Sequence, residues 1–112
     1  MKILFLDDSH ERINIVKKRW DKHELSIAET SQEAITLLSN FKFDLVSLDH
    51  DLGGEVYVKS GKNTGYEVAQ FIAKMKTPPP IVIVHSWNSV GAKNMMDELE
   101  NVTQTDYQPF GK

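Results

Sequence analysis

Three short, mostly apolar runs in the chain each end abruptly in polar and charged residues. The runs cover residues 3–6, 44–48 and 81–84, and the groups that follow them are Asp7-Asp8, Asp49-His50-Asp51 and His85-Ser86-Trp87-Asn88. Apolar runs of this length are typical of strands buried on both faces. Ligands bind at the carboxyl ends of the strands in an open parallel sheet. We therefore expect the polar groups to meet if the three strands lie side by side.

Four amphipathic helical stripes alternate with these strands. Each places apolar residues three or four positions apart, and the members are Ile13, Val16 and Trp20; Ala34, Leu37, Leu38 and Phe41; Val68, Phe71, Ile72 and Met75; and Ala92, Met95, Met96 and Leu99. Suitable helix caps are Ser9, Thr30 or Ser31, and Asn88 or Ser89. Weaker strands are predicted at 25–28 and around 106–107. The alternation predicts an α/β fold with a parallel sheet and helices on both faces.

The composition excludes several classes of function. The 112 residues carry a formal net charge of −3, so binding of double-stranded nucleic acid through its phosphates is not expected. Cysteine is absent, which removes disulfides, thiolate catalysis and cysteine zinc sites. No apolar segment has the length of a membrane span or a signal peptide. We therefore expect one cytoplasmic domain over residues 1–112, with no membrane partner.

Several segments resemble the receiver domains of two-component signalling. Asp7-Asp8 resembles the acidic pair after their first strand, and segment 44–49 resembles the run that ends in their phosphoacceptor aspartate, here Asp49. Segment 65–67 resembles the start of their third helix, Ser86 falls at their switch serine or threonine, and segment 108–110 falls at their lysine–proline pair. The resemblance covers nearly the whole chain. It implies a flavodoxin-like three-layer sandwich with strand order 2-1-3-4-5.

The chain also departs from ordinary receivers. Gln108 occupies the position of the receiver lysine that contacts the phosphoryl group, and the fifth helix is missing. Segments 50–54 and 85–88 are not ordinary receiver sequence. These departures resemble a divergent group, the cyclic-phosphate processing receiver domains. Members of that group have been proposed to act on cyclic phosphates in RNA-end or ADP-ribose metabolism.

The acidic residues predict a metal site. In the receiver-like fold the first and third strands are neighbours, so Asp7, Asp8 and Asp49 converge. Carboxylates close together repel one another, and Mg²⁺, or alternatively Mn²⁺, offsets that repulsion. Asp51 can share a side with Asp49 in an extended segment, either as a fourth metal ligand or as an outer partner. The alternatives are that Asp8 only caps the first helix and that His50 faces away and anchors the loop.

The segment after the strand at 81–84 offers groups for phosphate chemistry. His85 could act as a general acid or base, or as a ligand to Mn²⁺ or iron; the alternative is a core histidine bonded to backbone. Ser86 and Asn88 suit phosphate oxygens, although Asn88 could equally be only a helix cap. Trp87 is expected at the rim, where it would stack on a base or ribose or simply pack.

The long connection at 52–65 is rich in glycine, and such loops are often functional. We assign Gly53 and Gly54 to phosphate binding. Lys59 and Lys62 could supply the positive charge that is lost at Gln108.

Two functions compete for this site. The first is metal-dependent hydrolysis or binding of a small cyclic-phosphate ligand, a nucleotide or an ADP-ribose derivative, with Asp49, His85 and Asp8 as catalytic residues. In this hydrolytic mechanism His85 acts as the general acid or base, or alternatively Asp49 acts as a nucleophile. The second is a response-regulator receiver phosphorylated on Asp49, with a degenerate, protein-binding receiver as a weaker third. Gln108 and the missing fifth helix favour the first.

The missing helix also bears on assembly. It leaves Ile15 and part of one sheet face without their usual cover. Uncovered apolar surface commonly marks an interface, so a two-fold homodimer through this face is expected. The alternative is that the tail, residues 103–112, folds across the gap.

Overall fold

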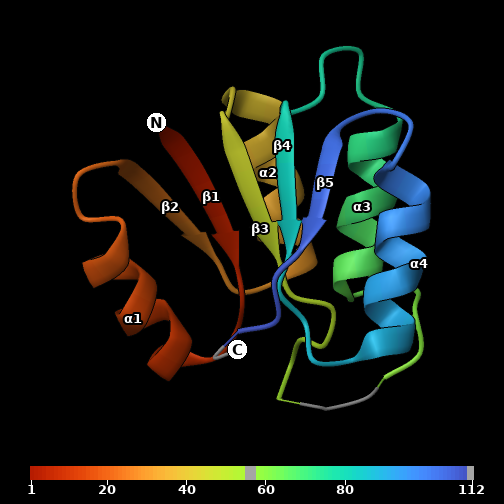
Figure 1. Cartoon of the computed structure of the whole chain (residues 1–112), viewed down its shortest axis with the longest axis horizontal. Helices are drawn as coiled ribbons and strands as arrows, with labels where there is room; N and C mark the ends of the chain where they lie inside the picture. Colours follow the sequence, from red (N-terminus) through yellow and green to blue (C-terminus); the bar gives the residue numbers. More distant parts are fainter. Residues whose placement is uncertain (55–57, 111–112) are drawn as a thin grey trace.

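The computed structural model describes residues 1–54 and 58–110 (Figure 1). Those parts of the predicted loop and tail that fall at 55–57 and 111–112 lie outside the described residues. The elements, in chain order, are β1 (Lys2–Leu6), α1 (His10–Arg19), β2 (Glu24–Ala28), α2 (Ser31–Asn40), β3 (Leu45–Leu48), α3 (Gly65–Ala73), β4 (Ile81–Val84), α4 (Ser89–Leu99) and β5 (Gln104–Tyr107).

The sheet has five strands in the order β2-β1-β3-β4-β5, and all neighbouring pairs are parallel. All arrows in Figure 1 therefore point the same way. This confirms the predicted flavodoxin-like α/β sandwich and its strand order. The register pairs Phe5 with Ser47 and Ser47 with Ile83, so equivalent positions of the three central strands lie side by side. No helix follows β5 within the described residues, as predicted.

Side-chain caps begin α1, α2 and α4 at predicted positions, and a cap that was not predicted begins α3. Ser9, Thr30 and Asn88 accept backbone N–H groups of the first turns of α1, α2 and α4, and Thr64 does the same for α3. Each such bond satisfies a backbone donor that has no partner inside its helix. None of the helices in the described part of the chain is long and apolar enough to cross a membrane.

The two faces of the sheet are covered very differently. One face packs against α2, α3 and α4, and it holds most of the buried apolar side chains, among them Leu4, Leu6, Val46, Leu48, Val82 and Val84. The other face packs against α1, and its buried apolar cluster consists of Phe5, Ile13 and Val16. Side chains alternate between the faces along a strand, so β1, β3 and β4 each contribute to both.

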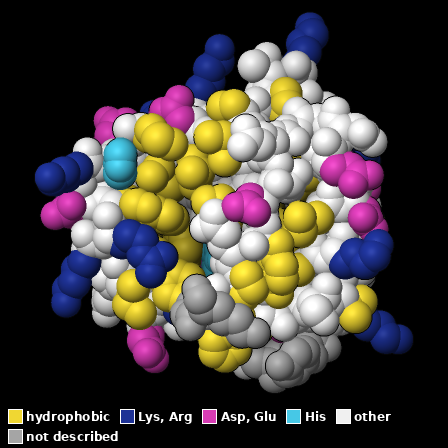
Figure 2. Space-filling model, in the orientation of Figure 1, with side chains coloured by type: hydrophobic (Ala, Val, Ile, Leu, Met, Phe, Trp, Pro, Cys, Tyr) yellow, Lys and Arg dark blue, Asp and Glu magenta, His cyan; other side chains and the backbone are white. Residues whose placement is uncertain are grey.

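The tail covers part of the α1 face. Phe110 packs against the cluster around Phe5, and a cavity of about 360 Å³ remains between the tail and the strands. Figure 2 shows hydrophobic side chains gathered on the side of the molecule that is turned to the viewer. Ile15 keeps 39% of its surface exposed. The homodimer through this face stays a prediction.

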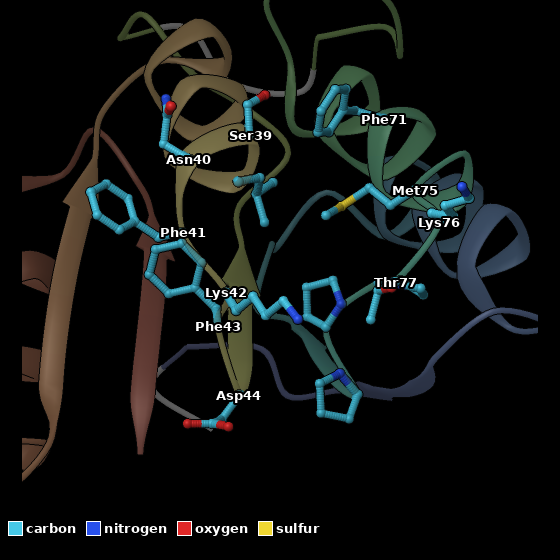
Figure 3. Close-up of a pocket in the computed structure, with 14 residues that line it drawn as sticks. Ser39, Asn40, Phe41, Lys42, Phe43, Asp44, Phe71, Met75, Lys76 and Thr77 are labelled. Carbon is cyan, nitrogen blue, oxygen red and sulfur yellow. The ribbon is translucent and has the colours of Figure 1, made fainter.

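Three stripe residues lie at or beyond the ends of their helices, namely Trp20, Phe41 and Met75, and of these Phe41 is exposed. Phe41 ends α2 as its C-cap in extended conformation, and it is 51% exposed instead of buried. It faces a pocket of about 570 Å³ at the amino end of the strands. Figure 3 shows Phe41 and Phe43 on one side of this pocket and Phe71 and Met75 on the other. This pocket lies at the opposite end of the sheet from the predicted site.

Candidate functional site

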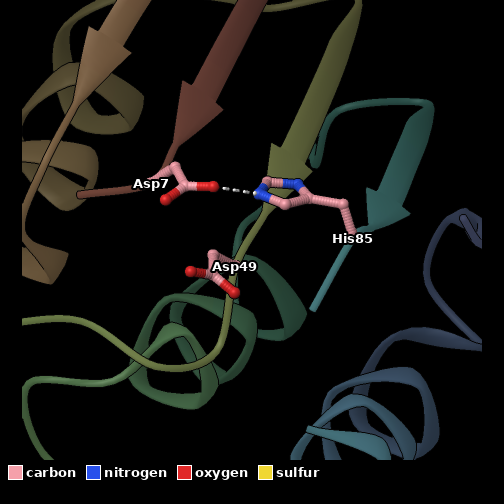
Figure 4. A group of neighbouring side chains, drawn as sticks. All are labelled: Asp7, Asp49 and His85. Atoms are coloured by element: carbon pink, nitrogen blue, oxygen red, sulfur yellow. Dashed lines mark hydrogen bonds and ion pairs between the residues drawn. The ribbon is translucent and has the colours of Figure 1, made fainter. Parts of the chain in front are cut away.

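Three side chains that follow neighbouring strands meet at the carboxyl end of the sheet. Asp7 follows β1, Asp49 follows β3 and His85 follows β4 (Figure 4). Ligand atoms of the three lie within 4.8 Å of one another. All three are buried, with exposures of 0%, 4% and 3%. Asp7 comes two positions after Phe5, and Asp49 comes two positions after Ser47, so the period of a strand places both carboxyl groups on the α1 face.

A guanidinium from α1 neutralises this group. Arg12 donates from Nε to Asp7 Oδ2 at 2.7 Å and from Nη2 to Asp7 Oδ1 at 3.0 Å. Its Nη2 also donates to Asp49 Oδ2 at 3.4 Å. Such two-pronged arginine–carboxylate pairs combine charge with fixed geometry. Arg12 is therefore part of the site, although sequence reasoning did not single it out.

His85 is held at both ring nitrogens. Its Nε2 lies 3.0 Å from Asp7 Oδ2, and its Nδ1 lies 2.7 Å from Ser47 Oγ. The ring stacks on Phe5 at a centroid distance of 4.7 Å. An ionised Asp7 only accepts hydrogen bonds, so Nε2 carries the proton of the neutral ring, and Nδ1 accepts from the Ser47 hydroxyl. Ser47 was also not singled out by sequence reasoning.

The environment shifts the pKa values of the three groups in different directions. Burial works to raise the pKa of Asp7, but hydrogen bonds from His85 and Arg12 outweigh it and lower that pKa. Burial, reinforced by the charge of Asp7, raises the pKa of Asp49 to about 7. Burial also lowers the pKa of His85, against the opposing effect of Asp7. The site thus holds a charged carboxylate, a neutral imidazole and a carboxyl group that exchanges its proton near neutrality.

The donor atoms of this site suit a divalent cation, but Arg12 already binds the oxygens of Asp7. Two carboxylates and an imidazole suit Mn²⁺ or iron as well as Mg²⁺. However, Asp7 Oδ1 already accepts from Ser9 N and Arg12, and Oδ2 accepts from Arg12 and His85. A cation bound to Asp7 would therefore have to replace hydrogen bonds from Arg12.

Asp8 lies outside this buried group, at its rim. Its Oδ2 accepts the Gly54 backbone N–H at 2.6 Å, so that N–H group already has a partner inside the protein. Gly53 and Gly54 have φ of +76° and +79°, a region that favours glycine. Asp8 and Gly53 line a pocket of about 620 Å³ together with Lys59 and Lys62. The predicted phosphate contact at Gly54 is thus taken by Asp8, whereas Gly53 and both lysines face one pocket.

A second polar network anchors the loop after β3. His50 is fully buried, and its ring contacts Asp51 Oδ1 at 2.7 Å and Ser60 Oγ at 2.8 Å. Asn88 donates to Asp51 Oδ1 and to the Val58 carbonyl, and its own Oδ1 caps α4 through Gly91 N. These contacts confirm that His50 anchors the loop and Asn88 caps a helix. Asp51 is not one of the residues whose ligand atoms cluster with those of Asp7, Asp49 and His85, although its charge still helps to raise the pKa of Asp49.

The remaining predicted phosphate contacts are engaged elsewhere. Ser86 Oγ accepts the Asn88 backbone N–H at 3.0 Å, which forms a local turn ahead of α4. Trp87 is 58% exposed, and its indole N–H donates to the Phe110 carbonyl at 2.6 Å. Gln108 donates to Asp106 Oδ2 at 2.7 Å. In the described structure the side-chain hydrogen bonds of Ser86 and Trp87 therefore hold the segment before α4 and the tail.

Weak signals for the two missed residues were present in the sequence. Ser47 is the polar residue inside an apolar strand, and it lies two positions before Asp49, on the same face by the period of a strand. Arg12 falls in the first turns of the helix that Ser9 caps, close after the acidic pair. Neither position indicates its distant partner, because His85 lies 38 positions after Ser47 and Asp49 lies 37 positions after Arg12.

Comparison with known proteins supports the receiver fold. The Leptospira biflexa HemR receiver domain is 24% identical, with a TM-score of 0.74 over 99% of this chain and 82% of that one. The Thermotoga maritima response regulator TrrA, solved in complex with Mg²⁺-BeF, is also 24% identical, with a TM-score of 0.74 over 99% and 90% of the two chains. The chain thus has the receiver fold.

The sequence comparisons place the chain more closely. It is 29% identical over 109 residues to the Bacillus subtilis sensory transduction protein LytT, covering 93% of this chain and 42% of LytT. The chain therefore spans less than half the length of that relative. The family model described as the cyclic-phosphate processing receiver domain matches residues 2–101. The chain belongs to this family.

Proposed function

We propose that this domain binds a cyclic phosphate diester at the carboxyl end of its sheet and opens the ring by hydrolysis. The observation that carries the proposal is the hydrogen-bonded series Ser47–His85–Asp7 beside Asp49. It puts an oriented imidazole next to a carboxyl group of raised pKa, and Arg12 joins both carboxyl groups. The family description supports the same class of substrate.

Asp49 is the group best suited to protonate the departing oxygen. Its pKa of about 7 leaves a large share of the carboxyl groups protonated near neutrality. When water attacks phosphorus, one P–O bond of the ring breaks, and the released alkoxide takes the Asp49 proton. Asp8, at the rim, is the carboxylate that would accept the proton of the water. A general acid matched in this way typically contributes ~10²–10⁴-fold.

The role of His85 changes from that expected. Its lowered pKa disfavours the imidazolium form, and both ring nitrogens already have partners. These features support His85 as a positioning residue that orients Asp7 and, through it, Arg12. A divalent cation held by Asp7 and Asp8, which leaves Asp49 free to carry its proton, would neutralise charge on the phosphate when bound. Lys59 and Lys62 favour the approach of an anion from the neighbouring pocket.

The test uses adenosine 2′,3′-cyclic phosphate and ADP-ribose cyclic phosphate, with products separated by chromatography. We expect the wild type to open at least one ring and Asp49→Asn to lose at least ~10²-fold of that rate. Asp44→Asn, an exposed carboxylate at the other end of β3, is the matched control and should retain full activity. A wild type that turns over neither compound would refute the proposal. A larger loss in His85→Ala than in Asp49→Asn would return the acid to His85.

Phosphorylation of Asp49 is the second candidate, and the similarity to LytT and to solved receivers favours it. A carboxyl group attacks phosphorus only in its ionised form, and the pKa of about 7 works against that form without a cation. Gln108 is neutral and bonds Asp106, so it offers no positive charge. The check is incubation with acetyl phosphate and Mg²⁺ followed by mass spectrometry. A stable acyl phosphate on Asp49, without hydrolysis of either cyclic compound, would establish the receiver function instead.

A further inference from the structure

The positive charge at the buried carboxyl groups comes from Arg12. Its guanidinium contacts Asp7 through Nε and Nη2 and Asp49 through Nη2. The side chain is 28% exposed, whereas those of Asp7 and Asp49 are 0% and 6% exposed. Of these three side chains, Arg12 is therefore the most accessible to a ligand that comes from the solvent.

Arg12 still has donors to offer. An arginine carries five N–H donors, and those on Nε and Nη2 are used on Asp7 and Asp49. No hydrogen bond from Nη1 occurs within residues 1–54 and 58–110. An anion that reaches Asp49 would thus meet a fixed guanidinium edge with free N–H groups. Guanidinium groups bind phosphate oxygens well because their planar fork matches two of those oxygens.

The other nearby basic side chains are placed differently. Lys59 and Lys62 line the pocket that borders Asp8, and no ion pair joins either of them to Asp7 or Asp49 among the described residues. Arg19, on the same helix as Arg12, lies over the Phe110 ring, 5.2 Å from its centroid. Arg12 is therefore the basic residue that is paired with both carboxyl groups among the residues described.

We infer that Arg12 is the resident cation of this site, which binds a phosphate oxygen of a ligand at Asp49 and competes with a divalent metal ion for Asp7. The inference rests on the proposed function only in taking the ligand of Asp49 to be a phosphate. It implies two effects of opposite sign. Removal of Arg12 weakens the binding of anions, because a charge-assisted donor is lost. The same change strengthens the binding of metal ions, because the oxygens of Asp7 become available.

The experiment measures two affinities by calorimetry, inorganic phosphate alone and Mn²⁺ alone, for the wild type, Arg12→Gln and Arg19→Gln. We expect Arg12→Gln to weaken phosphate binding by about 10-fold or more and to tighten Mn²⁺ binding by a similar factor. Arg19→Gln, the matched control on the same helix, should leave both affinities unchanged. A general loss of structure would lower both affinities together. An Arg12→Gln variant that is folded but binds phosphate as well as the wild type does, or that binds both ions more weakly, would overturn the inference.

Two further measurements decide the case if Arg12→Gln does not fold, since it leaves Asp7 buried without its main partner. Arg12→Lys keeps the charge but loses the fork, so it should tighten Mn²⁺ binding while weakening phosphate binding less than Arg12→Gln would. In the wild type, Mg²⁺ should shift the side-chain Nε–H resonance of Arg12 in NMR spectra and leave that of Arg19 in place. An Arg12 resonance that does not respond to Mg²⁺ contradicts the competition.

These measurements are independent of turnover. If neither cyclic phosphate is hydrolysed but the two affinities move in opposite directions, the proposed reaction fails and the role of Arg12 stands. If hydrolysis is found but the affinities do not move, the role of Arg12 fails alone.

Discussion

The two faces of the sheet bury different kinds of side chain. The face under α2, α3 and α4 is lined by apolar side chains, such as Leu6, Val46 and Val84, that are fully buried. The α1 face buries polar groups instead, among them Ser47, Asp49 and His85. Both faces are built from the same strands, so one residue along the chain separates a packing position from a chemical one.

The comparison shows why the site lies on the thinner face. Burial of apolar side chains supplies about 25 cal/mol per Å², so the broad core under three helices is the main source of stability. That leaves the α1 face free to bury charged groups, which cost stability unless they are paired. Arg12 and His85 are the partners of the buried Asp7, and Phe110 of the tail covers the neighbouring ring of Phe5.

The largest expected effect is a difference in stability between truncations on the two faces of the sheet. Leu48→Ala opens a cavity in the broad core and should lower the free energy of unfolding by about 2–5 kcal/mol. Ile83→Ala removes a similar volume from the partly exposed α1 face of β4 and should cost less than about half as much. Urea denaturation of both variants measures the difference. Equal losses would mean that the tail and α1 form a core as effective as that of the other face.

The second effect concerns pH and is confined to Asp49. In the unfolded chain its carboxyl titrates near its ordinary pKa of 3.8, and in the folded protein near 7. The group therefore costs nothing below about pH 4, costs progressively more as the pH rises to about 7, and costs a constant amount above that, at most about 4 kcal/mol. Asp49→Asn should gain stability relative to the wild type over that window.

The measurement for Asp49 is a series of urea unfolding curves between pH 4 and pH 8 with a chelator present. Titration of Asp7 and His85 occurs in both proteins, so the difference between the two reports the titration of Asp49 together with its coupling to Asp7. Asp21→Asn, at an exposed position, serves as the control. A stability difference that does not vary with pH would show that the carboxyl group titrates normally.

A smaller effect tests the polar series on the α1 face. Ser47→Ala leaves the buried Nδ1 of His85 without a donor, which should cost about 1–3 kcal/mol. It should also weaken the preference for the tautomer with the proton on Nε2, and long-range ¹H–¹⁵N spectra report that tautomer directly. Ser39→Ala, an exposed serine bonded to its own helix, should change neither quantity. If Ser47→Ala leaves the tautomer of His85 unchanged, Asp7 alone determines that tautomer.

The smallest effect is association through the α1 face. We propose a homodimer there because Ile15 remains 39% exposed while the tail packs around Phe5. Sedimentation at micromolar concentrations should show a dimer in the wild type and a monomer in Ile15→Glu. A wild type that sediments only as a monomer would show that the tail provides sufficient cover.

Much of the fold could be predicted because its signals are local. Apolar runs mark the strands, the spacing of three and four marks the helices, and Ser9, Thr30 and Asn88 are caps whose partners lie within three residues. Phe41 misled because a stripe does not indicate the turn at which a helix ends. The abrupt change from apolar to acidic residues at Asp7 and Asp49 also identified the edge of the sheet that carries the site.

Tertiary structure alone decided which side chains meet and in what protonation state. Asp7 and His85 are separated by 78 positions, and Arg12 and Asp49 by 37, so no local pattern could pair them. Burial raises the pKa of Asp49 to about 7 and lowers the pKa of His85, and burial is a property of the packed molecule. The sequence by itself determined that acids and a histidine would lie at the ends of the strands. Only the packing of α1 and β4 against those ends determined that Arg12 joins Asp7 to Asp49 and that Ser47 orients His85.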